Sequence, residues 1–326
     1  MAASLLVVAE VAEGAVTRLS LEVATLARTL AAQGGLEVTG LVVAADPAGP
    51  AAELAGYLPA VHAVAVPSLA SEVPAAATAA AVLERIGRGV THVLLGASAD
   101  GRDVAGALIA LTGWGLLANA SAASWSDAGP EVQGVVLGGK VITTYRLTGD
   151  TGIITVRTGA VTAEPAASAG TVTAADAPAA NPALPAVTVV DRVEEAGAAV
   201  SLEDAKVIVV GGRGVGGPEG FELVGKLAEV LGGVVAATRA SVDSGWIPYA
   251  RQIGQTGKTV RPRLYLGLGV SGAMQHRVGM QGSETIVIVN RDPDAPIREV
   301  ADLMVIGDLF EVGPALIAEL RARAAG

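Results

Sequence analysis

Short runs of β-branched and aliphatic residues alternate with amphipathic helical segments along most of this chain. Residues 1–126 contain four such runs, at 4–10, 36–44, 61–66 and 91–97, and each is followed by apolar residues at helical spacing. Parallel strands need a helical crossover between them, so this alternation predicts a parallel sheet covered by helices. The expected fold class is therefore α/β.

The helices expected after these runs cover residues 20–32, 51–58, 74–88 and 103–114. An uncharged stretch at 104–126 is long enough to span a membrane. It is interrupted by glycines, serines and Asn119, so we expect a buried helix of a soluble domain instead.

The pattern changes after residue 126. Residues 132–157 contain apolar runs separated by glycine-containing turns, which predict hairpin strands at an antiparallel edge. Residues 163–185 are rich in Ala, Pro and Thr, so we expect an exposed, mobile and dispensable loop or linker. Residues 186–195 are expected to return as a final strand.

A second series of strands and helices begins near Ser201. Apolar runs predict strands at 206–210, 234–240, 263–269, 284–290 and 302–308, with helices at 218–231 and 311–324. A chain of 326 residues corresponds to about two domains at ~150 residues each. We therefore predict two parallel-sheet α/β domains, residues 1–199 and 200–326.

Composition excludes several classes of function. The chain has no cysteine, which excludes disulfides, thiolate metal sites and a cysteine nucleophile. Its net charge of −10 and its 3% of aromatic residues argue against nucleic-acid binding. No basic segment precedes the first apolar run, so we expect no secretory signal and a cytoplasmic protein without direct membrane insertion. With three histidines and no cysteine, no metal site is expected.

Two glycine loops of the second half bear on nucleotide binding. Gly212, Gly214 and Gly217 fit G-x-G-x-x-G between a strand and a helix, which indicates either phosphate or flavin contact or a turn that only permits close packing. The segment 254–259 resembles a phosphate loop, but Gln252 stands where that pattern needs its first glycine. We therefore exclude nucleotide hydrolysis there, while Gln255 and Thr256 remain available to a cofactor.

Cations gather without counter-charge in the second half. No acidic residue lies between Asp243 and Glu284, which indicates either a bound anion or pairing with acids elsewhere in the fold. The cations in this window are Arg251, Lys258, Arg261, Arg263 and Arg277. His276 follows an expected strand, where α/β folds bind ligands, although a structural role is the alternative. His62 and His92 lie in apolar strands, and we expect both to be structural.

Six blocks of the second half carry a family resemblance. They read GGRGVGG, TRASVDSGWIP, RQIGQTGKTV, LYLGLGVSGAMQH, IVIVNRDPDAPI and IGDLFEVGP, in this order over residues 203–326. This region resembles the alpha subunit of electron transfer flavoproteins. The segment THVLLGASADGRDVAGALIA and the expected hairpin at 140–157 resemble the first domain of that family.

The resemblance implies one FAD in a Rossmann-like C-terminal domain and a beta subunit as heterodimer partner, which carries AMP or a second FAD. It implies an electron carrier rather than an enzyme with its own substrate. Its electron donors would be dehydrogenases, notably the acyl-CoA dehydrogenases of fatty acid oxidation, and its acceptor a membrane quinone oxidoreductase. The implied flavin contacts are Arg213, Thr238, Arg239, Ile253, Gly254, Gln255, Thr256, Ser271, Gly272, Ala273, Met274, Gln275, His276, Asn290, Asp308 and Leu309.

The resemblance also implies a role for several of these side chains. Arg239 would stabilise negative charge on the reduced ring. His276 would donate to the N1/C2-carbonyl side, and Thr256 would bond near N5/C4-carbonyl. Asn290 and Asp308 would bind the sugar and adenine end.

Three other functions stay open at this point. One is the alpha subunit of a bifurcating electron transfer flavoprotein, whose partner oxidises NADH. Another is an NAD-dependent dehydrogenase, although Thr238 and Arg239 stand where an acidic residue would bind the ribose. The last is a nucleotide-sensing module without catalysis, since an α/β fold alone fixes no function.

Overall fold

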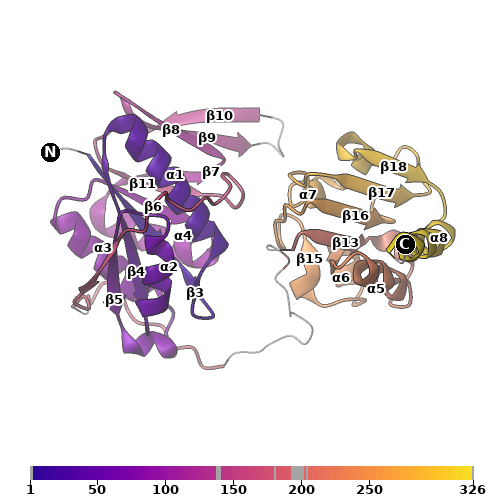
Figure 1. Ribbon diagram of the computed structural model, residues 1–326, viewed down its shortest axis with the longest axis horizontal. Helices are drawn as coiled ribbons and strands as arrows, with labels where there is room; N and C mark the ends of the chain where they lie inside the picture. The colour runs from indigo at the N-terminus through magenta and orange to yellow at the C-terminus, as the bar shows by residue number, and fades with distance from the viewer. Residues whose placement is uncertain (1–2, 137–140, 180, 192–201, 203–204, 325–326) are drawn as a thin grey trace. The chain divides into compact units, whose positions relative to one another are not determined.

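The computed structural model describes residues 3–136, 141–179, 181–191, 202 and 205–324 (Figure 1). The chain divides into two compact units, Met1–Arg192 and Val193–Gly326, which are described separately below. The expected boundary at residues 199 and 200 lies outside the described residues.

Unit 1 is built on a seven-stranded parallel sheet. Its strands are β1 (Ser4–Ala9), β4 (Glu37–Ala44), β5 (Ala60–Ala65), β6 (His92–Gly96), β7 (Gly115–Ala120), β11 (Gly152–Val156) and β12 (Thr171–Ala175). They lie in the order β12-β5-β4-β1-β6-β11-β7, and a short hairpin of β2 (Val11–Ala12) and β3 (Ala15–Val16) follows β1. Strands β4, β5 and β12 lie on one side of β1, and β6, β11 and β7 lie on the other. The strand order therefore switches sides between β1 and β6.

Helices cover both faces of this sheet, as the alternation predicts. They are α1 (Arg18–Gly34), α2 (Ala48–Ala55), α3 (Ala75–Gly87) and α4 (Ala99–Thr112), with a short 3-10 helix η1 (Pro67–Ala70). Apolar residues of α1 and α2 share one core cluster, whereas those of α3 and α4 share the other. The start of α1 is fixed by Thr17, whose hydroxyl accepts the N–H of Ser20, and its end by Gly35 at φ 62°.

The uncharged stretch 104–126 is not one helix, which corrects our expectation. Helix α4 ends at Thr112, because Gly113 takes a left-handed conformation at φ 69° and caps it. The rest of the stretch forms β7 and β8 (Ala122–Ser126). Among the described residues, no helix is long and apolar enough to cross a membrane.

The hairpin expectation for 132–157 holds only for its first part. β8 forms an antiparallel three-stranded sheet with β9 (Gly129–Val136) and β10 (Val141–Arg146). β11 instead lies inside the main sheet, parallel to β6 and β7, and all five of its residues are buried. An uninterrupted apolar run of this kind is typical of a parallel strand covered on both faces.

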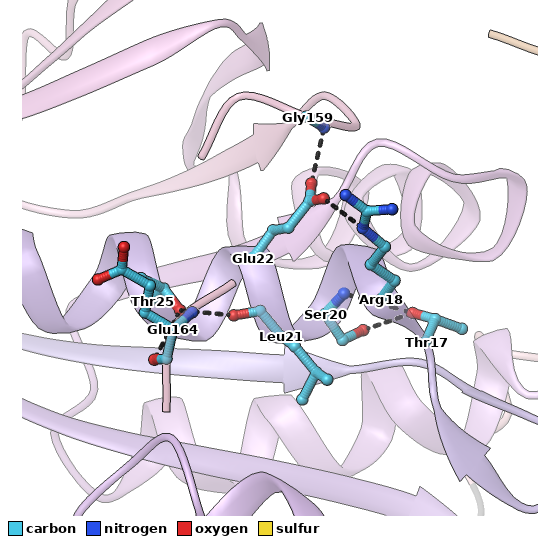
Figure 2. Close-up of polar contacts among 8 residues, drawn as sticks. All are labelled: Thr17, Arg18, Ser20, Leu21, Glu22, Thr25, Gly159 and Glu164. Atoms are coloured by element: carbon cyan, nitrogen blue, oxygen red, sulfur yellow. Dashed lines mark hydrogen bonds and ion pairs between the residues drawn. The ribbon is translucent and has the colours of Figure 1, made fainter. Parts of the chain in front are cut away.

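Residues 163–185 are not a free loop, which corrects a second expectation. Figure 2 shows Glu164 against α1: its N–H donates to the Thr25 hydroxyl at 3.0 Å, and that hydroxyl lies 3.3 Å from the Glu164 carbonyl oxygen. Arg28 also donates to this carbonyl, at 2.9 Å. Seven residues later the chain forms β12, which pairs with β5 at the edge of the sheet. Farther on, the expected strand at 186–195 is reduced to an isolated bridge between Thr188 and Glu72, and its end lies outside the described residues.

Unit 2 is a second parallel α/β fold, as expected. Its strands are β13 (Val207–Gly211), β14 (Val234–Thr238), β15 (Gln252–Ile253), β16 (Leu264–Leu268), β17 (Ile286–Asn290) and β18 (Leu303–Ile306). They lie in the order β15-β14-β13-β16-β17-β18, all parallel. This is the order typical of dinucleotide-binding folds, with a switch point between β13 and β16.

Two long helices, α5 (Gly220–Val230) and α8 (Leu309–Ala324), share an apolar cluster on one face of this sheet. The other face is covered mainly by the irregular segments that follow β15 to β17. Short helical turns complete the unit. They are α6 (Arg239–Asp243), α7 (Met274–Arg277), η3 (Arg213–Val215), η4 (Tyr249–Arg251) and η5 (Pro296–Val300).

Candidate functional site

Every predicted site residue lies at the carboxyl edge of the unit 2 sheet. Each of the six strands ends in one of the predicted segments. In sheet order these are Ile253–Thr256 (β15), Thr238 and Arg239 (β14), Arg213 (β13), Ser271–His276 (β16), Asn290 (β17), and Asp308 with Leu309 (β18). Ligands of open α/β sheets bind at this edge, beside the switch point.

The glycine loop after β13 packs on the loop after β16. The N–H of Gly214 donates to the carbonyl of Gly269 at 3.0 Å, and a Cβ on Gly212 would lie 2.3 Å from that oxygen. Close packing therefore explains these two glycines. Gly217 faces open space and Arg213 is exposed, without an ion-pair partner among the residues described. A ligand can therefore reach this loop only on the side of Arg213 and Gly217, which does not pack against Gly269.

The end of β14 presents one cation to solvent. Thr238 is buried, and its hydroxyl lies 3.3 Å from that of Ser241, which in turn donates to the Gly211 carbonyl. Arg239 is exposed and pairs with Asp243 at 3.1 Å, one helical turn later. Such exposed pairs contribute little stability, so the guanidinium can exchange this partner for a ligand.

The loop after β15 is held by residues that the sequence did not single out. Gln252 is buried and donates to the Thr256 hydroxyl at 3.0 Å. The hydroxyl of Tyr249 donates to the Thr256 carbonyl, and the N–H of Gln255 donates to the carbonyl of Gln275 at 2.7 Å. In the sequence, Gln252 is notable only because it breaks the phosphate-loop pattern, which gives no sign of this orienting contact.

His276 is buried, and both of its ring nitrogens have protein partners. Nε2 lies 2.7 Å from the hydroxyl of Tyr265, and Nδ1 lies 3.0 Å from the carbonyl oxygen of Ile253. Burial lowers the pKa of His276 to about 4, partly offset by the Ile253 carbonyl. The expected donation from this ring to a flavin would require one of these two bonds to break.

Asn290 and Asp308 also have roles within the fold. The side-chain amide of Asn290 donates to the Val270 carbonyl at 2.8 Å. Asp308 accepts the N–H of Phe310 at 2.8 Å at the start of α8 and pairs with Arg291. The Phe310 N–H and the Arg291 guanidinium hold the pKa of Asp308 below its usual value. The carboxylate is therefore charged at neutral pH.

The cations of the acid-free window are partly neutralised by acids at or beyond its end. Arg263 lies 3.9 Å from Glu284 and Arg277 pairs with Glu299, while Arg251 donates to the Val235 carbonyl. Pairing within the fold therefore explains Arg263 and Arg277. Outside this window, Arg213 and Arg239 are exposed cations at the carboxyl edge, although Arg239 also pairs with Asp243.

His62 and His92 lie in β5 and β6 of the unit 1 sheet and take no part in the candidate site of unit 2. His92 is buried, contacts the Thr91 hydroxyl through Nδ1 at 3.0 Å, and packs edge-on against Trp125. Burial lowers the pKa of His92 to about 4 and also lowers that of His62, beside Arg85. The part of the chain that is described contains no group of three or more His, Asp or Glu side chains able to hold a metal ion.

Comparison with known proteins agrees with this geometry. The family model for the electron transfer flavoprotein domain matches residues 5–182, and that for the electron transfer flavoprotein FAD-binding domain matches residues 201–281. The chain is 43% identical to an electron transfer flavoprotein subunit alpha of Mycobacterium tuberculosis, over 98% of this chain and 99% of that protein. It is 49% identical to the same subunit of Mycobacterium leprae over 71% of each chain. It is 58% identical to that of Thermoanaerobacterium thermosaccharolyticum over 39% of each. The chain therefore belongs to the electron transfer flavoprotein alpha-subunit family.

Proposed function

We propose that this chain is the FAD-carrying alpha subunit of a heterodimeric electron transfer flavoprotein. The observation that carries the proposal is the convergence of six predicted segments at one carboxyl edge of a dinucleotide-type sheet. Most of that edge lies within the residues matched by the FAD-binding domain model.

The residues at this edge fit a flavin dinucleotide in size and charge. Six strand ends in a row provide an extended surface, as a two-part ligand requires. Arg213 and Arg239 are exposed cations suited to a pyrophosphate and to a negatively charged ring. Gln255 and Thr256 are exposed polar residues on one loop, and the buried Gln252 holds that loop by donating a hydrogen bond to the Thr256 hydroxyl.

When bound, the flavin supplies one-electron chemistry, which needs no acid, base or nucleophile from the protein. The chain's own residues bind and orient it. Arg239 offsets negative charge at the ring end, and Thr256 presents a hydroxyl whose position is fixed by Gln252. Asn290 and Asp308 provide polar groups at the far end of the sheet edge, and their own hydrogen bonds hold both in place.

The proposal includes partners by class. A beta subunit completes the heterodimer and carries AMP, dehydrogenases such as acyl-CoA dehydrogenases donate electrons, and a membrane quinone oxidoreductase accepts them. We place the protein in the cytoplasm. In the bifurcating alternative, the beta subunit carries a second FAD and oxidises NADH.

The first test is the visible spectrum and flavin count of the chain co-expressed with its beta subunit. We expect a yellow heterodimer with one FAD that accepts electrons singly during stepwise reduction. Two FAD molecules per heterodimer would support the bifurcating alternative. A colourless heterodimer that binds no added FAD would exclude the flavoprotein assignment.

The second test addresses Arg239. Replacing it with alanine removes only an exposed ion pair, so the fold should be retained. A loss of about 1–2 kcal/mol of charge stabilisation lowers a one-electron potential by roughly 40–90 mV. Arg263→Ala is the matched control, since Arg263 is also an exposed arginine with an acidic partner but precedes β16 at the opposite edge. Equal potentials in the two variants would contradict the role of Arg239.

A further inference from the structure

A buried tyrosine of β16 contacts His276, one of the predicted flavin-site residues. Tyr265 is the second residue of β16, is fully buried, and belongs to the apolar cluster on one face of the unit 2 sheet. Its hydroxyl lies 2.7 Å from Nε2 of His276, eleven residues later, on the turn that follows the strand. Tyr265 lies within one of the six family-like blocks, but the sequence did not mark it as a site residue, because it reads as an ordinary member of an apolar strand.

The hydrogen-bond partners fix the protonation of the histidine. The Ile253 carbonyl can only accept, so Nδ1 of His276 carries a proton and donates to it. Burial disfavours the charged ring, so Nε2 carries no proton at neutral pH and accepts from the tyrosine. Burial also raises the pKa of Tyr265 above its usual value, so its hydroxyl remains a donor. The direction of this chain of bonds is therefore from Tyr265 to His276 to Ile253.

This chain of bonds joins two of the predicted flavin-binding segments. Ile253 begins the loop 253–256, and His276 ends the segment 271–276. The two segments touch closely: a Cβ on Gly254 would lie 2.8 Å from the Gln275 carbonyl oxygen, and the Gln255 N–H donates to that same oxygen. A rotation of the His276 ring would therefore break its hydrogen bond to the Ile253 carbonyl, which supports the contact between the two segments.

We propose that Tyr265 is a positioning residue of the flavin site, which holds His276 as the neutral Nδ1–H tautomer and thereby sets loop 253–256 against segment 271–276. This inference rests on the proposed function, since it concerns how the site is shaped for its cofactor.

The test uses the heterodimer carrying Tyr265→Phe, which keeps the ring in the core and removes only the hydroxyl. Nitrogen NMR of labelled histidine reports the tautomer, and flavin titration reports the dissociation constant for FAD. The chain has three histidines, so the signal of His276 is assigned by its loss in His276→Asn. Tyr57→Phe is the control, because the Tyr57 hydroxyl makes no hydrogen bond among the described residues.

In the wild type we expect a single Nδ1–H tautomer for His276. In Tyr265→Phe we expect a mixture of tautomers and FAD binding weakened about 3–10-fold, as for one lost hydrogen bond. His276→Asn, whose side chain is too short to span from the Ile253 carbonyl to the Tyr265 hydroxyl, should weaken binding similarly if Tyr265→Phe does not fold. Tyr57→Phe should change neither quantity.

Different outcomes overturn different statements. A wild-type His276 protonated at Nε2 would overturn the inference without any variant. An unchanged tautomer or an unchanged dissociation constant in Tyr265→Phe would also overturn it. Failure of the wild-type heterodimer to bind FAD would instead exclude the proposed function, and it would be recognised before any variant is compared.

Discussion

The carboxylate of Glu22 accepts the backbone N–H of Gly159 at 2.6 Å, across 137 residues of chain. Glu22 lies on α1 and is 1% exposed, while Gly159 follows β11 (Figure 2). Arg18, one turn earlier on the same helix, lies 3.3 Å from the other carboxylate oxygen. A buried carboxylate needs such partners, so this contact fixes the chain just after it leaves β11, which lies next to the edge strand β7.

Glu22→Gln should therefore destabilise unit 1. The amide keeps the shape and one acceptor but loses the charge that strengthens both contacts, so we expect a loss of roughly 1–3 kcal/mol. Amide hydrogen exchange at Gly159 measures this directly, since its protection should fall with the contact. Glu37→Gln is the control, because Glu37 is exposed at the start of β4. Equal protection of Gly159 in both variants would contradict the assignment.

The segment after Gly159 gives a second prediction. Thr25→Val removes the hydroxyl that accepts the Glu164 N–H. The segment that leads to β12 therefore loses one of its hydrogen bonds to α1. We expect a destabilisation of about 1–2 kcal/mol and faster amide exchange across 164–175. Thr29→Val on the same helix is the matched control, since within the described part of the chain its hydroxyl bonds to the carbonyl of Thr25 alone. Unchanged exchange across 164–175 would restore the interpretation of this segment as a free loop.

The alternating pattern was sufficient to predict the α/β class, the four helices of unit 1 and five of the six described strands of unit 2, and it missed the two-residue β15. It failed for β11 and β12, because local sequence does not encode which strand a segment pairs with. Residues 152–156 follow a hairpin along the chain, yet they lie between β6 and β7. The Ala-rich segment around β12 has a loop-like composition, and only pairing with β5 makes it a strand.

The candidate site shows a similar division. The family resemblance supplied the site residues, and the apolar runs predicted the strand ends on which most of them lie. The end of β15, before Gln255 and Thr256, was not predicted. The supporting contacts of Gln252 and Tyr265 could not be predicted. Both residues lie in family-like blocks, but their roles depend on atoms that only folding brings together. The glycine pattern of the loop after β13 was compatible with phosphate or flavin contact and with close packing alone. Contact with Gly269 shows that close packing accounts for Gly212 and Gly214.

Acidity should destabilise both units through their buried histidines. The folded-state pKa values of His92 and His276 are lowered to about 4, below the ordinary value of 6.5, because burial disfavours the charged rings. The unfolded chain therefore takes up protons first as pH falls. Stability is fully present above about pH 7 and is lost between 6.5 and about 4, with a slope of up to about 1.4 kcal/mol per pH unit from His276.

Urea unfolding at several pH values, read by amide exchange so that the units are separated, checks this dependence. In His276→Gln, unit 2 should lose that part of the slope, whereas unit 1 should keep its own. A slope unchanged in unit 2 would mean that folding leaves the pKa of His276 near its ordinary value, so that burial does not disfavour the charged ring.

Gly272 gives the last prediction, because its position allows no side chain. Its φ is 78°, and a Cβ would lie 2.4 Å from the backbone nitrogen of Ile297, whose N–H donates to Ser271. Gly272→Ala must therefore both strain the backbone and displace η5, at a cost of at least about 1–2 kcal/mol. Gly225→Ala is the control in the same unit, since Gly225 lies inside α5 with open space around it. There alanine should stabilise by roughly 0.5–1 kcal/mol. Thermal unfolding of the two variants should shift in opposite directions, and only Gly272→Ala should reduce FAD retention. A stable Gly272→Ala variant with full FAD content would show that segment 271–276 can move without affecting the site.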